Sequence, residues 1–434
     1  MGYGTGVLKA YYAVSFSRGL TVGVAGASSL FISQQSGAPQ NFLVAARGLG
    51  MILSPALFAR CIGRMVWCGE SQSGFAGALM MKVLAELVVA RSNSVINLYL
   101  AFFVIGIAMA VLDTSAQVLV TRVHEENCGK AMMIYCAVYG IGCMLAPSLT
   151  IINPRMAWVA VAFTDFLVAL LVARRRFFVG KPRNWKAKVR KVTPVSPSTS
   201  PPPAQPKSSA QDAGSEKVAT QPTNGQGAGM ESRLPARIVR AGVLFIFVAE
   251  ATETAMSCWA FTYAVTALRL SEKVAALFPT AFYFSFTLTR LAVLPASTRV
   301  PPSSIVQVGT LAMLTGSSIF FGLSMLTGAD SAPGPLAVKL LLGSLVLIGA
   351  GSCPLYPMML ASIRQHGDLS PEEQGWFMTS YSGGITMGMW LPGVVDLPGM
   401  ELVGGVISFL IMTTHVRDFP WFRPVAKAEA MGDC

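Results

Sequence analysis

The sequence predicts an all-α membrane protein in which twelve transmembrane helices form two pseudo-symmetric six-helix bundles. Three observations predict this class: a scarcity of charge, a series of apolar runs of spanning length, and motifs that recur in the two halves. Only 12% of the 434 residues are charged and 53% are hydrophobic. A soluble domain usually carries about twice that charged fraction, because its whole surface faces water. Residues that face lipid need no charge.

The apolar runs match the length of a membrane-spanning helix, for which about 20 residues suffice. The first run is longer than the apolar region of a signal peptide, so we expect it to remain as a helix. In the first half we expect spans near 10–33, 41–60, 72–91, 96–119, 130–151 and 156–174. In the second half we expect spans near 237–265, 273–295, 303–326, 336–361, 375–394 and 400–416.

A polar segment rich in Ser, Pro, Gly and Gln separates the halves at residues 181–235. It is too poor in apolar residues to fold, which predicts a disordered linker. Residues 174–240 hold 14 Lys and Arg against 3 acids, nearly the whole net charge of +12. Basic loops stay in the cytoplasm, so we expect both termini there as well, in a multi-pass protein of the plasma membrane. The predicted domains are residues 1–180, 181–235, 236–418 and a cytoplasmic tail, 419–434.

The two halves share motifs at nearly constant offsets. Ile105-Gly106 and Leu112-Asp113-Thr114 recur 243 residues later as Ile348-Gly349 and Leu355-Tyr356-Pro357, and Arg47 and Arg290 are separated by the same 243 residues. A second set recurs 246 residues later, where Gly129, Tyr135, Gly142 and Leu145 match Gly375, Tyr381, Gly388 and Leu391. These matches predict two parallel halves that rock about a central site.

A charge near the bilayer centre is costly and indicates function by default. Asp113 lies in the middle of the fourth span, and Gln117 follows one turn later on the same face. Together they offer a titratable acid and a two-way hydrogen-bonding group to a central cavity. The alternative is that Asp113 pairs with Arg18 or Arg47 and only locks helices together.

The seventh span carries Glu250 and Glu253 within one turn, followed by Trp259 and Tyr263. A carboxylate with a nearby aromatic ring suits a sugar, because the acid binds hydroxyl groups and the ring packs on C–H faces. The alternative is structural: a carboxylate paired across the bundle, with rings that pack against neighbouring helices or lipid.

Other polar residues within the spans receive weaker assignments. Lys82 and Glu86 are spaced i,i+4 and are expected to neutralise each other, while Asp165 is buried without an assigned role. Pro and Gly residues in the tenth and eleventh spans suit kinked gating helices. We expect Tyr135, Tyr356 and Tyr381 to line the cavity, and Arg47, Arg290, Gly63 and Arg64 to serve gating or structure.

Several classes of function lack support in the sequence. A Walker-type glycine loop is missing, the eight cysteines and three histidines form no ligand cluster, and no nucleophile, base and metal constellation is present. We therefore expect no enzyme, no metal and no cofactor. The basic charge belongs to one loop, so it predicts no binding of nucleic acid.

The motifs resemble those of the major facilitator superfamily, and in particular its fucose permease and sodium-dependent glucose transporter branch. The resembling segments are 112–117 in the fourth span, Glu253 with 259–265 in the seventh, and 281–283 with 287–291 in the eighth. The resemblance implies a proton-coupling role for Asp113. Two departures stand out: the loop ending in Gly63-Arg64 keeps only that final pair of the superfamily motif, and the first span lacks the acid and amides usual in the branch.

We expect secondary transport of a small polar solute, first a hexose-like sugar, by a monomer in the lipid bilayer. Asp113 and Glu253 would exchange a proton or hold a sodium ion, while Gln117, Glu250 and Trp259 would contact the solute. Alternatives are an orphan facilitator for another solute, drug-like export, uniport without an ion, or a non-transporting membrane sensor or scaffold.

Overall fold

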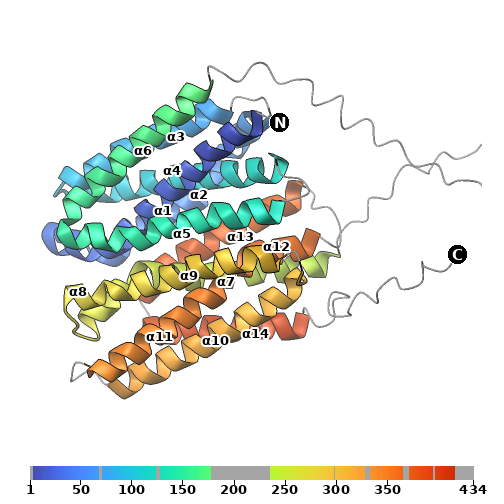
Figure 1. The fold of residues 1–434 in the computed structure, drawn as a ribbon. Helices are drawn as coiled ribbons and strands as arrows, with labels where there is room; N and C mark the ends of the chain where they lie inside the picture. Colours follow the sequence, from blue (N-terminus) through green and yellow to red (C-terminus); the bar gives the residue numbers. More distant parts are fainter. Residues whose placement is uncertain are drawn as a thin grey trace, which may run out of the picture. The chain divides into compact units, whose positions relative to one another are not determined.

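A computed structural model describes residues 3–67, 71–123, 128–176, 235–297, 299–327, 333–364, 371–393 and 396–415 (Figure 1). Within these residues the regular structure is helical. The predicted domain boundaries at 180 and 418 lie outside the described residues and the one at 235 lies at their edge, so these divisions stay predictions.

Six helices make up the first half, each at one of the expected spans. They are α1 (Tyr3–Ser36), α2 (Gln40–Trp67), α3 (Ser71–Arg91), α4 (Val95–Val123), α5 (Cys128–Ile152) and α6 (Pro154–Arg176). The helices α1, α2 and α4 extend well beyond the predicted ends of their spans. Polar residues at the ends of these helices lower the local hydropathy, which shortens the predicted spans. The backbone still satisfies its hydrogen bonds there by continuing the helix.

Six further spans make up the second half, and two of them are interrupted. The helices are α7 (Ala236–Thr266), α8 (Glu272–Ala275), α9 (Leu277–Ala296), α10 (Pro302–Thr327), α11 (Pro335–Ser352), α12 (Leu355–Arg364), α13 (Pro371–Trp390) and α14 (Leu397–His415), with the 3-10 turn η4 (Leu391–Gly393) after α13. The expected tenth span breaks into α11 and α12 at Pro354, whose ring has no N–H to continue the helical ladder. The predicted kink thus has a counterpart in the tenth span, whereas the eleventh continues as α13 through Gly383 and Gly384.

The outer faces of the helices are apolar, as expected for surfaces that contact lipid. Six of the described helical segments are long and apolar enough to cross a membrane by length and composition alone. Large side chains such as Leu84 of α3, Ile96 of α4 and Phe163 of α6 are 62–70% exposed. The inner faces instead bury polar groups, because charges within a bilayer turn toward the bundle interior.

Glycines bring the paired helices of each half into backbone contact, in the same pattern twice. A Cβ at Gly142 of α5 would collide with the Phe16 carbonyl oxygen of α1, and one at Gly388 of α13 would collide with that of Ala251 of α7. Likewise Gly106 of α4 abuts the backbone of α2, and Gly349 of α11 abuts that of α9. The halves are therefore internal repeats at the level of helix contacts.

One predicted match between the halves is wrong. Gly106 lies against the carbonyl of Arg47, but Gly349 lies against that of Phe282. Phe282 is therefore the counterpart of Arg47, and Arg290 lies about two turns further along its helix. The offset between the second spans of the two halves differs from that between the fourth spans because the intervening segments differ in length.

The close α1–α5 contact makes Gly142 intolerant of a side chain. We expect Gly142→Leu to destabilise the folded protein by about 1–3 kcal/mol, as overpacking a tight interface does. Gly77→Leu is the matched control, since a Cβ at Gly77 would meet nothing within 4 Å. Thermal unfolding in detergent measures both. Equal stability of the two variants would contradict the backbone contact.

Candidate functional site

A buried ion pair joins α1 to α4 in the first half. Arg18 Nη1 lies 2.6 Å from Asp113 Oδ1 and donates to the Tyr135 hydroxyl of α5 at 2.7 Å. The guanidinium lies over the Tyr139 ring, 5.6 Å from its centroid. Asp113 is only 2% exposed. The structure therefore turns this acid into the bundle, away from lipid, and realises the pairing with Arg18 that the sequence left as an alternative.

The second half places a related set of residues at the corresponding positions. The shift that relates Phe16 to Ala251 takes Arg18 to Glu253, and the motif offsets take Asp113 to Tyr356 and Tyr135 to Tyr381. The Tyr356 and Tyr381 rings lie 5.0 Å apart at an interplanar angle of 47°. The first half thus presents an arginine, an acid and a tyrosine where the second presents an acid and two tyrosines.

Arg290 connects these two sets across the halves. Its Nη1 donates to the carbonyl of Cys136, the residue after Tyr135, so it joins α9 to α5; Figure 1 shows these helices side by side. Its guanidinium also lies 3.9 Å from the centroid of the Phe286 ring. Arg290 attracts both Glu253 and Glu250 electrostatically, and Arg18 also attracts Glu250, whereas Asp113 repels it.

The charges of this central cluster do not balance. Its members are the guanidinium groups of Arg18 and Arg290 and the carboxyl groups of Asp113, Glu250 and Glu253, which act on one another from both halves. If all are ionised, one carboxylate is in excess. A buried charge without a counter-charge is costly.

Arg47 lies outside the central cluster, at another contact between the halves. It is 1% exposed, and it donates from Nε to Met389 Sδ at 3.3 Å and from Nη2 to Cys258 Sγ at 3.2 Å. Its Nη1 has no acceptor among the described residues. Trp259, predicted to meet the solute, donates Nε1–H to the Met389 carbonyl at 3.0 Å in this conformation. Both side chains hold α13, one against α2 and the other against α7.

At three predicted site positions the structure describes the backbone but not the side chain. Gln117 lies in α4, and Gly63 and Arg64 lie in α2; their roles stay predictions. The sequence indicates Arg18 only as a partner for Asp113, although a lone arginine in the first span is itself a signal of a central charge. Tyr139 follows Tyr135 by one turn of α5, and its ring lies under the Arg18 guanidinium.

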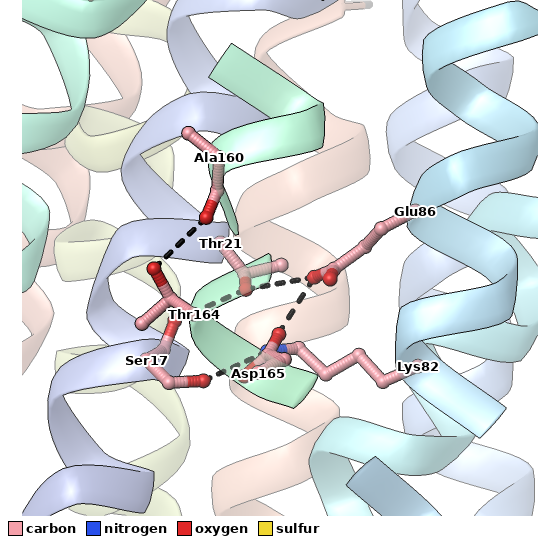
Figure 2. Close-up of polar contacts among 7 residues, drawn as sticks. All are labelled: Ser17, Thr21, Lys82, Glu86, Ala160, Thr164 and Asp165. Carbon is pink, nitrogen blue, oxygen red and sulfur yellow. Dashed lines mark hydrogen bonds and ion pairs between the residues drawn. The ribbon is translucent and has the colours of Figure 1, made fainter. Parts of the chain in front are cut away.

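The expectation that Lys82 and Glu86 neutralise each other is incomplete. Lys82 Nζ lies 2.5 Å from Asp165 Oδ2 of α6 but 3.5 Å from Glu86 Oε1 of its own helix. Figure 2 shows all three side chains meeting between α1, α3 and α6. Packing of α6 against α3 thus gives Lys82 a closer partner than the i,i+4 spacing does. Asp165, which the sequence left without a role, is that partner.

Among the described residues, no group of His, Cys, Asp and Glu side chains could hold a metal ion.

Comparison with known proteins agrees with this architecture. Among solved structures the chain is similar to the nucleoside transporter NupG. A point mutant of NupG gives a TM-score of 0.60 at 13% identity, covering 94% of this chain and 99% of that one. A second NupG structure gives 0.57 at 12% identity, covering 98% and 100%.

A comparison with curated protein sequences finds no match. The family model described as Major Facilitator Superfamily matches residues 11–389, which include both halves. The repeated six-helix halves, the buried charges between them and this match lead to one conclusion. The chain belongs to the Major Facilitator Superfamily and is a multi-pass membrane transporter of a small-molecule solute, not an enzyme.

Proposed function

We propose that the protein carries a hydroxylated solute, such as a hexose-like sugar, together with one proton or one sodium ion. The single observation that supports this proposal is the central cluster, in which carboxylates outnumber guanidinium groups. A bound cation neutralises the excess carboxylate. The hydroxyl groups of a sugar are donors to Glu250 and Glu253 and acceptors from Arg290, and the Tyr356–Tyr381 pair offers an apolar surface to its C–H faces.

The contacts between halves suit a rocking motion about this cluster. On the side where α2 begins, Gln40 donates from Nε2 to Thr262 of α7 at 2.8 Å, and Thr386 of α13 donates to the Gly48 carbonyl at 2.9 Å. Deeper in the bundle, α5 and α9 meet at Cys136 and Arg290. Contacts between the halves made by few polar groups can break and re-form at modest cost. We further propose that both termini face the cytoplasm of the plasma membrane.

The proposal is tested by uptake of labelled solutes into proteoliposomes under an imposed proton gradient, sodium gradient or neither. The panel includes hexoses, pentoses, nucleosides, amino acids and organic cations. We expect accumulation of a sugar or sugar-containing solute that one of the two gradients drives. Accumulation of organic cations alone would favour drug-like export, and the absence of any uptake would favour a sensor or scaffold.

A further inference from the structure

A second polar cluster lies within the first half, apart from the central one. Lys82 and Glu86 come from α3, Asp165 comes from α6, and Ser17 and Thr21 come from α1 (Figure 2). The side chains of the lysine and both acids are 0% exposed. Thr21 donates to Glu86 Oε1 at 3.0 Å, and Lys82 Nζ lies 3.4 Å from Ser17 Oγ.

The positive charges in this cluster do not match the negative ones. One ammonium group faces two carboxyl groups, and the other charged side chains described on α1, α3 and α6 are paired elsewhere or, like Arg91 and Arg174, exposed. Arg18 and Asp113 pair with each other, and Arg155 donates to Gln35 and Asn93. With both carboxyl groups ionised, the cluster would hold one uncompensated negative charge in a fully buried site, which is highly unfavourable.

The geometry of the two acids indicates how the excess negative charge is neutralised. The carboxyl groups of Glu86 and Asp165 converge on the same ammonium group (Figure 2), since Lys82 Nζ lies 3.5 Å from Glu86 Oε1 and 2.5 Å from Asp165 Oδ2. Glu86 Oε2 and Asp165 Oδ1 receive no hydrogen bond from any donor in the described chain. Two carboxylate oxygens can share a hydrogen bond only when one of them carries a proton.

We infer that Lys82, Glu86 and Asp165 form a proton-binding site that holds one proton between the two carboxyl groups. The bound proton neutralises the cluster, with Lys82 balancing the remaining carboxylate. The site also bears on the central cluster, because α1 brings Ser17 to Lys82 and its next residue, Arg18, to Asp113. The inference goes beyond the proposed function, since the site lies wholly in the first half and its test needs no solute.

Infrared difference spectroscopy of the full chain in lipid tests the site directly, because a protonated carboxyl group has its own carbonyl-stretching band. The difference between wild type and Glu86→Gln at neutral pH should contain one such band. Asp165→Asn should remove a band of equal area, and the triple variant Lys82→Met/Glu86→Gln/Asp165→Asn should remove no more. Removal of either acid leaves the other paired with Lys82, so the shared proton has no remaining role.

Lys82→Met should have the opposite effect and about double the band, because both acids must then be neutral. Glu401→Gln is the control: this α14 acid is fully buried and its oxygens also lack donors among the described residues, so any band that it removes must be independent of the others. An unchanged spectrum in Glu86→Gln or in Asp165→Asn would overturn the inference. So would a triple variant that loses twice the area of a single one, since the acids would then hold separate protons.

Discussion

Asp113→Asn should abolish gradient-driven accumulation of the solute while leaving exchange of solute across the membrane partly intact. The amide keeps a hydrogen-bond acceptor for Arg18, which lies 2.6 Å away, but it cannot bind or release a proton. Loss of the charge also breaks the buried pair with Arg18, which lowers the stability of the folded protein even though the charges of the central cluster then balance. Accumulation and exchange in proteoliposomes, measured beside thermal unfolding, separate the two effects.

The double variant Arg18→Gln/Asp113→Asn is the matched control. It removes both charges, so most of the lost stability should return, because a buried pair replaced as a whole costs far less than a broken one. Accumulation should not return. Undiminished accumulation by Asp113→Asn would remove this acid from the coupling role, and recovery of accumulation in the double variant would assign the loss to instability alone.

Lys82→Met should destabilise the folded protein by about 3–5 kcal/mol, the cost of removing one partner from a buried ionic cluster. Methionine matches the apolar stem of lysine but leaves Glu86 and Asp165 without a counter-charge, so both must bind protons. The loss should be smaller at acidic pH, where protons are abundant. Thermal unfolding in detergent across a pH series measures it.

The triple variant Lys82→Met/Glu86→Gln/Asp165→Asn is the control for this effect. It replaces all three charges by neutral groups of similar size, and it should recover most of the stability lost in Lys82→Met. A Lys82→Met protein as stable as wild type at neutral pH would show that the cluster has no need of the ammonium group. That outcome would contradict the conclusion that Lys82 balances one of the two buried carboxylates.

The fold was predictable from the sequence because lipid imposes a simple rule. Each crossing must satisfy its own backbone hydrogen bonds, so a run of about 20 apolar residues becomes a helix. All twelve expected spans correspond to helices, and the break at Pro354 follows from proline chemistry. The glycine matches, such as Gly142 with Gly388, were also informative, because close backbone contact tolerates no larger residue.

The partners of the buried charges were less predictable, because they come from different helices. Spacing along one helix paired Lys82 with Glu86, whereas packing of α6 against α3 supplies Asp165 as the nearer partner. A single offset likewise cannot relate all spans of the halves, since loops of different length intervene. The correspondence of Arg18 with Glu253 emerges only once the contacts of α1 and α7 are known.

A reversible cross-link between the halves tests the central claim most directly. A Cβ at Gly48 of α2 would lie 3.2 Å from the Thr386 Cβ of α13, so a small outward adjustment gives the separation found in disulfides. In a cysteine-free background, Gly48→Cys/Thr386→Cys should stop transport when oxidised and regain it on reduction. The single variants Gly48→Cys and Thr386→Cys cannot form the cross-link, so oxidation should leave their transport unchanged. Full transport by the oxidised Gly48–Thr386 pair would contradict movement of the halves against each other.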